Sequence, residues 1–291
     1  MGLTTNQADT FHEKGFLVVE NVLTDADLAP VIAEYEAWIE RRACALAAEG
    51  KITDLYPDAP FERRLGLLYS QSPEIASGLD IMYARGPATF AFLRNEHLLD
   101  AVESLVGPEI TCSPIQHIRA KPPASSAGEG AGFYNVPWHQ DAGVTWEEAD
   151  SANIVTCWMP LVDATVENGC MEVMPGVWKG GYRAHQAEGG TTIRPDLLPD
   201  IAPVPVPVKK GGIIFMHRHT PHRSTPNHTD TVRWSLDLRY QPTGSPTGRP
   251  FHPEFVARSR HPETVLTDHA EWSRRWEQAL ENSRGIKAHR V

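Results

Sequence analysis

The fold is decided by the stretch VPVPVKKGGIIFMHRHTPHRSTPNHTDTVRWSLDLRY, which occupies residues 204–240. Several short segments here and upstream are rich in β-branched and apolar residues and are bounded by Gly, Pro and Asn, which is typical of strands. The strands that we expect are 153–159, 169–174, 204–208, 213–216 and 232–240. No helical pattern separates them, so the sequence predicts an antiparallel sandwich or barrel rather than a parallel α/β sheet.

A further strand is predicted at 109–120, where the residue types alternate between two faces. Gln116 and Arg119 fall on opposite faces, so at most one of them points into the interior. The Gly/Ser-rich segment 124–135 and the Gly/Pro-rich segment 179–201 are predicted to be loops. For both segments, the composition is compatible with either a passive surface loop or a lid over the site.

Helices are expected on both sides of this β region, from apolar residues at helical spacing and from capping residues. They are 8–14, 24–48, 62–68, 87–93, 96–106 and 269–282. A short buried strand at 16–19 follows the first helix. Because no repeat occurs, we expect one domain over residues 1–291, with a helical portion at about 1–108, a β core at about 109–241 and a C-terminal helix at about 268–282.

Composition excludes several classes of function. The formal net charge is −10 and Lys and Arg do not cluster, so nucleic acid is not an expected partner. The four cysteines lack Cys-x-x-Cys spacing, which argues against structural zinc and favours a reducing, cytoplasmic location. We find no signal-peptide pattern and no apolar run near the ~20 residues of a membrane span. A small molecule is the expected partner, and the oligomeric state stays open.

The motif His139-Gln140-Asp141 places an imidazole and a carboxylate two residues apart, which on a strand puts both on one face and allows both to bind one metal ion. With 13 His in 291 residues such a pair also arises by chance, and His228 and Asp230 form a second one in a polar turn. A ferrous oxygenase site needs a second His, and an Arg to grip the far carboxylate of an oxo-acid co-substrate. Candidates for this His are His217, His219 and His222.

Four blocks occur in one order: His139-Gln140-Asp141, Asn168-Gly169-Cys170-Met171-Glu172-Val173-Met174-Pro175-Gly176, His222-Arg223-Ser224 and Arg233. Between about residues 110 and 240, and after a similar opening at 15–19, the chain resembles the phytanoyl-CoA dioxygenase family of Fe(II)/2-oxoglutarate oxygenases. In that family the distal His ligand precedes the 2-oxoglutarate Arg by eleven residues. Only His222 stands in that relation to an Arg, Arg233. The resemblance thus implies His139, Asp141 and His222 as metal ligands.

The resemblance further implies a mainly β fold with flanking α-helices and a double-stranded β-helix core, the jelly roll of cupin-like proteins. It implies Fe(II), 2-oxoglutarate as co-substrate and O2. Arg233 would bind the far carboxylate of 2-oxoglutarate, and Ser224 and Lys121 match family contacts to it, although a Lys at a strand end is as often solvated. Trp158 would pack on the co-substrate, but a Trp in a strand is more often simply core.

The expected activity is that of a dioxygenase that hydroxylates a small organic metabolite, lipid-like or a natural product, and releases succinate and CO2. Asp141 argues against halogenation, because related halogenases lack this carboxylate. Desaturation, epoxidation or rearrangement would differ only in substrate placement, and a metal-binding jelly roll without turnover is the alternative from another class. Four aromatic residues that flank the proposed site suit either an apolar ligand or the core: Phe133, Tyr134, Trp146 and Trp178.

Overall fold

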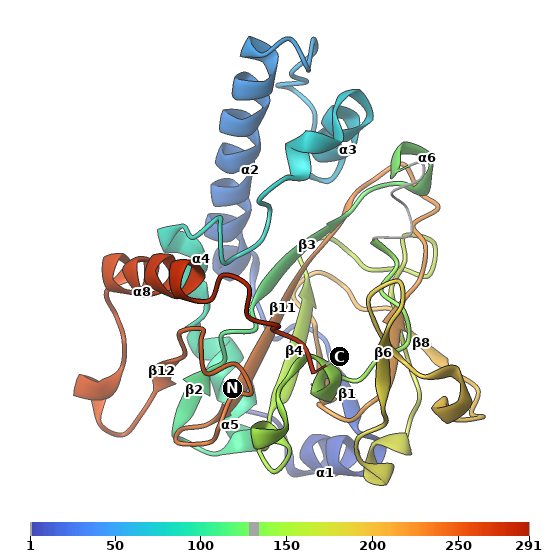
Figure 1. The fold of residues 1–291 in the computed structure, drawn as a ribbon, viewed down its shortest axis with the longest axis vertical. Coiled ribbons are helices and arrows are strands. Elements are labelled where there is room, and N and C mark those ends of the chain that lie inside the picture. Colours follow the sequence, from blue (N-terminus) through green and yellow to red (C-terminus); the bar gives the residue numbers. More distant parts are fainter. Residues whose placement is uncertain (1, 128–133, 291) are drawn as a thin grey trace.

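The computed structural model describes residues 2–127 and 134–290, and it shows β-sheets flanked by helices (Figure 1). The helices are α1 (Thr5–Lys14), α2 (Asp25–Ala48), α3 (Phe61–Gln71), α4 (Pro87–Phe92), α5 (Glu96–Val106), α6 (Ala124–Ala127) and α8 (His269–Asn282). The strands are β1 (Phe16–Val19), β2 (Ile110–Cys112), β3 (His117–Lys121), β4 (Val155–Pro160), β5 (Met171–Val173), β6 (His185–Ala187), β7 (Thr191–Ile193), β8 (Val204–Val206), β9 (Ile213–His217), β10 (His222–Ser224), β11 (Arg233–Pro242) and β12 (Phe255–Arg258).

Two antiparallel sheets form the core. The larger has the order β1-β9-β4-β11-β2-β12, with β3 also paired to β11, and the smaller has the order β10-β5-β8. Strands β6 and β7 form a separate hairpin. The sequence prediction of a mainly β fold with a jelly-roll core and flanking helices is confirmed.

In the larger sheet, strand β11 has one apolar and one polar face. Successive side chains of a strand point to opposite faces. One set joins the helices in the main apolar cluster and consists of Trp234, Leu236, Leu238 and Tyr240. The other set is polar and consists of Arg233, Ser235, Asp237 and Arg239. This second face looks toward the smaller sheet, where Trp158 packs with Met171 and Val173 in a second apolar cluster. The polar set is therefore held in the interior of the jelly roll.

Local signals fixed the helices well. Thr24 and Asp27 form a reciprocal capping box at the start of α2. Asn95 caps α5 and Asp268 caps α8, and both helices have the predicted bounds to within one residue. Gly15 ends α1 with φ of 80°, a left-handed conformation that glycine adopts without strain. None of the described helices has the length and apolarity needed to cross a membrane.

The predicted single strand at 109–120 is wrong. It is two strands, β2 and β3, which pair with different parts of β11. Pro114 lies between the two strands and has no backbone N–H to donate to a neighbouring strand. Within this break, the Gln116 side-chain amide donates a hydrogen bond of 2.8 Å to the carbonyl of Ser113. The segment 179–201, predicted as loop, contains the β6–β7 hairpin. Strands β10 and β12 were not predicted.

Candidate metal centre

The predicted ligands His139, Asp141 and His222 lie together in the interior. Their ligand atoms all lie within 4.8 Å of one another, and all three side chains are buried. The Nε2 atoms of His139 and His222 are 3.9 Å and 4.0 Å from Oδ1 of Asp141. Two imidazoles and one carboxylate converging on one point form the donor set of a non-heme Fe(II) site with open positions.

The backbone brings these three residues together in a way that the sequence did not indicate. His139 and His222 pair across an isolated antiparallel bridge, with N···O distances of 3.0 Å and 2.9 Å. Asp141 does not continue a strand, since it begins a 3-10 turn over Asp141–Val144. Gln140 between His139 and Asp141 is extended, so both side chains point to the same side, as the alternation of a strand predicts. The bridge adds His222 to this pair.

Each histidine is oriented by a backbone carbonyl. Nδ1 of His139 lies 2.9 Å from the oxygen of Pro137, and Nδ1 of His222 lies 2.9 Å from that of Thr220. A carbonyl only accepts, so each Nδ1 carries the proton and each Nε2 presents its lone pair to the common point. Burial and the neighbouring His222 lower the pKa of His139 to about 3, which keeps it neutral. These residues fit a bound metal ion.

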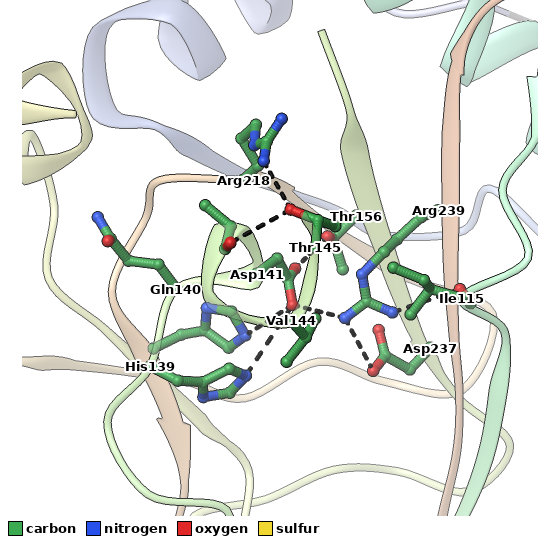
Figure 2. Close-up of polar contacts among 12 residues, drawn as sticks. Ile115, His139, Gln140, Asp141, Val144, Thr145, Thr156, Arg218, Asp237 and Arg239 are labelled. Carbon is green, nitrogen blue, oxygen red and sulfur yellow. Dashed lines mark hydrogen bonds and ion pairs between the residues drawn. The ribbon is translucent and has the colours of Figure 1, made fainter. Parts of the chain in front are cut away.

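Asp141 is held by two side chains of the larger sheet (Figure 2). Arg239 Nη2 lies 2.5 Å from its Oδ1, and the Thr156 hydroxyl donates to Oδ2. Burial alone would raise the pKa of Asp141, but Arg239, His222 and His139 together outweigh burial and hold the pKa well below its usual range. Sequence reasoning missed Arg239. The available signal was its position six residues after Arg233, on the same face of the strand.

Replacing Arg239 with Met is expected to lower the free energy of unfolding by about 3–5 kcal/mol, because it leaves the buried Asp141 carboxylate without its partner. Urea denaturation of the metal-free protein measures this. The control is Arg274→Met, which removes an exposed ion pair with Glu271 on α8 and should shift the midpoint little. Equal shifts for the two variants would contradict the assignment.

A second group of predicted residues lies beside the triad. Lys121 pairs in register with Arg233 across β3 and β11. Its Nζ donates to Ser224 Oγ at 2.9 Å, and the guanidinium of Arg233 lies over the ring of Trp158 at 5.0 Å. Trp158 also belongs to the inner apolar cluster, in agreement with the alternative prediction of a core residue.

Lys121 and Arg233 are buried basic residues, only 2% and 3% exposed, and neither forms an ion pair with a carboxylate in the part of the chain that the structure describes. Arg233 Nε also has no hydrogen-bond partner there. Burial, and then the charge of Arg233, lower the pKa of Lys121 to about 6. A buried guanidinium without an anionic partner is costly, and a nearby negative charge would favour the charged form of Lys121, so the pair is suited to a ligand that brings negative charge.

The competing candidates lie elsewhere. His228 is exposed, and Asp230 forms a surface ion pair with Arg63 at 2.8 Å. The His217 ring packs at a tilt against Trp178, and its Nδ1 accepts the backbone N–H of His219 at 3.1 Å. Neither His217 nor His219 belongs to a metal-type cluster among the described residues.

The other residues that the sequence placed near the site lie in different environments. Gln116 is fully buried, whereas Arg119 is exposed and alternates with Lys121 on the interior face of β3. Three of the four aromatic residues pack on other rings: Tyr134 on Tyr69, Trp146 on Phe251 and Trp178 on His217. The fourth, Phe133, lies outside the described residues.

Comparisons with known proteins agree with this geometry. The model of the phytanoyl-CoA dioxygenase (PhyH) family matches residues 11–235. The peroxisomal phytanoyl-CoA dioxygenase of Rattus norvegicus is 26% identical over 246 residues, which cover 82% of this chain and 68% of the relative.

Solved structures share the fold. A non-heme monooxygenase, ThoJ in its apo form, has a TM-score of 0.60 at 22% identity and covers 97% of this chain and 100% of its own. The epimerase SnoN in complex with Fe3+, alpha ketoglutarate and nogalamycin RO has a TM-score of 0.57 at 21% identity and covers 84% and 86%. With a family match that spans all three clustered ligands and Arg233, the chain belongs to the phytanoyl-CoA dioxygenase family.

Proposed function

We propose that this chain is an Fe(II)/2-oxoglutarate-dependent dioxygenase that hydroxylates a small organic molecule, lipid-like or a natural product. One observation carries the proposal. Two imidazoles with free Nε2 atoms and one carboxylate converge next to two buried basic residues, Lys121 and Arg233, that have no carboxylate partner among the described residues. A metal chelate with a dianionic co-substrate would satisfy both groups at once.

Each residue has a defined role in this proposal. His139, Asp141 and His222 hold the metal, and Arg239 fixes the orientation of the Asp141 carboxylate. Arg233 binds the far carboxylate of 2-oxoglutarate through its planar fork, and Trp158 supports that guanidinium from one side. Lys121 and the Ser224 hydroxyl contribute to the same carboxylate.

Bound Fe(II), 2-oxoglutarate and O2 supply an oxidative decarboxylation that gives succinate and CO2 and oxidises the substrate. The chain itself binds and orients the reactants and excludes water from a buried site. The same residues are compatible with desaturation, epoxidation or rearrangement, and the solved relatives include an epimerase and a carbocyclase. Asp141 disfavours halogenation. A jelly roll that binds metal without turnover is the alternative from another class.

Anaerobic titration with Fe(II) and 2-oxoglutarate tests the proposal. The expected result is the weak visible charge-transfer band of the chelate, followed by succinate formation when O2 is admitted. A metal-loaded protein that shows no band with 2-oxoglutarate would overturn the co-substrate assignment.

Binding of 2-oxoglutarate is expected to take up a proton near neutral pH. Lys121 has a pKa of about 6 in the free protein and is mostly neutral at pH 7.5. A bound carboxylate favours its charged form and raises this pKa. Affinity should therefore be constant below about pH 6 and fall as the pH rises toward the raised pKa.

Calorimetry in buffers of different ionisation enthalpy measures this uptake. In Lys121→Met the proton uptake and the pH dependence should both disappear. An unchanged uptake in that variant would contradict the role of Lys121.

Three further statements belong to the same proposal. The chain is one dioxygenase domain, its partner is a small molecule, and its location is cytoplasmic. The last is supported by four cysteines in the free thiol state.

A further inference from the structure

The C-terminal segment 283–290 returns to the interior side of the jelly roll. In Figure 1 it leaves α8, passes β11 and ends between the labels of β4 and β6. The carbonyl of Lys287 accepts the Trp146 indole N–H at 3.2 Å, and a hydrogen bond of 2.6 Å joins His289 to Thr191 of the hairpin. Arg290 pairs with Asp150 and donates to the carbonyl of Thr145 at 3.1 Å. The segment is thus fastened both to the loop that follows Asp141 and to β7.

A row of basic side chains lies on the interior face near this segment. Arg119 is the register partner of Ser235, and His117 is the partner of Asp237. Ser235 lies between Arg233 and Arg239 on β11, so Arg119 lies beside the row that runs from the proposed co-substrate clamp to the partner of Asp141. Side chains directly opposite in an antiparallel pair have Cβ atoms about 5 Å apart.

The acids on this face are already engaged. Asp237 pairs with Arg239 at 3.4 Å, and Asp80 pairs with His117 at 2.8 Å. Arg119 is exposed and makes no ion pair or hydrogen bond to a described residue. It therefore offers an unpaired, accessible guanidinium on the face of β3 that carries Lys121.

Arg249 adds a second uncompensated cation. It is buried, its Nε donates to the carbonyl of Val144 at 2.8 Å, and no carboxylate of the described residues pairs with it. Partial loss of hydration, and then the charges of Arg249, His117, Arg119 and Arg239, lower the pKa of His289. Arg249 is held at the carbonyl of Val144, next to Thr145, whose carbonyl binds Arg290 of the C-terminal segment. The excess of positive charge contrasts with the formal net charge of −10 of the whole chain.

We propose that the substrate carries an anionic group, a carboxylate or a phosphoryl-type oxyanion, which Arg119 binds next to the metal centre with Arg249 as the second cation. This rests on the proposed function and names the substrate class of the same site. A guanidinium binds an oxyanion through two parallel hydrogen bonds, so the anion fixes the position of the rest of the substrate relative to the metal. The C-terminal segment, with His289, lies on this side of the site, attached to the loop after Asp141 and to β7.

Three probes of one chain length test the proposal: hexanoate, hexylphosphonate and the neutral hexanamide. Each is titrated anaerobically into protein saturated with Fe(II) and 2-oxoglutarate, and perturbation of the charge-transfer band reports binding. At least one anion is expected to bind about tenfold or more tighter than the amide, and the stronger of the two identifies the oxyanion. Amide binding as tight as that of both anions would overturn the proposal.

Arg119→Gln should weaken binding of the preferred anion about tenfold or more and leave the amide unchanged, and Arg119→Lys should retain part of the affinity. Because Arg119 is exposed, folding should not be affected. The matched control is Arg41→Gln on α2, an exposed guanidinium of the helical layer. Unchanged anion affinity in Arg119→Gln would also overturn the proposal.

Failure of the anion site can be distinguished from failure of the proposed oxygenase function. If wild-type protein shows no charge-transfer band, the oxygenase assignment fails. Calorimetric titration of the same probes into the protein without iron then tests the anion site by itself, with the same expected loss in Arg119→Gln. No difference between anion and amide in that titration would reject the site.

Discussion

Replacing His222 with Ala is expected to abolish succinate formation from 2-oxoglutarate, and replacing His228 with Ala is expected to leave it intact. His222 points its Nε2 at Asp141 Oδ1 from within the interior, with its Nδ1 bonded to the Thr220 carbonyl. Its loss leaves two of three protein ligands. Loss of groups that merely orient a ligand already costs 10–100-fold in metal affinity, so loss of the ligand itself should cost at least about 100-fold.

The measurement pairs turnover with a metal dissociation constant, obtained by titration of the metal-free protein with Co(II). His139→Ala and Asp141→Ala should behave as His222→Ala does. His219→Ala is the most informative control, since His219 was a candidate from sequence and lies outside the cluster. Retained turnover in His222→Ala, or lost turnover in His228→Ala with unchanged circular dichroism, would overturn the choice of ligands.

Replacing Arg233 with Gln is expected to raise the dissociation constant of 2-oxoglutarate by about 10–100-fold. A hydrogen bond to a charged group contributes roughly 1.5–3 kcal/mol, and a tenfold change in affinity corresponds to about 1.4 kcal/mol. The cost should lie toward the upper end, because Arg233 is buried and water replaces its interaction poorly.

Pyruvate supplies the matched control, because it has the keto-acid end of 2-oxoglutarate without the far carboxylate. Wild-type protein should strongly prefer 2-oxoglutarate in the charge-transfer titration, and Arg233→Gln should bind both compounds with similar, weak affinity. A variant that keeps the full preference would show that another residue binds the far carboxylate.

The helices and many strands could be predicted because their signals are local. The bounds of α5 follow from Asn95, an apolar face and a terminal glycine, all within about a dozen residues. Strand β11 could be read from its alternation alone. The ends of β4, β5 and β8 shifted by one or two residues, as expected where pairing rather than propensity ends a strand.

For the metal site too, part could be predicted from the sequence and part required the structure. The residue types and spacing of His139-Gln140-Asp141 made a metal site one option among others, and the choice of His222 over His217 and His219 came from the family resemblance. The structure supplied a physical basis for it: the backbone bridge between His139 and His222.

The sequence by itself determined the mainly β class, the helical flanks and the identities of the ligand candidates, because periodicity, capping and family motifs are written in neighbouring residues. Only the tertiary structure decided that Arg239 pairs with Asp141, 98 residues away, that β12 joins β2, and that the C-terminal segment lies against the loop after Asp141. Such neighbours depend on strand register and on the packing of one sheet against another. No local propensity encodes them.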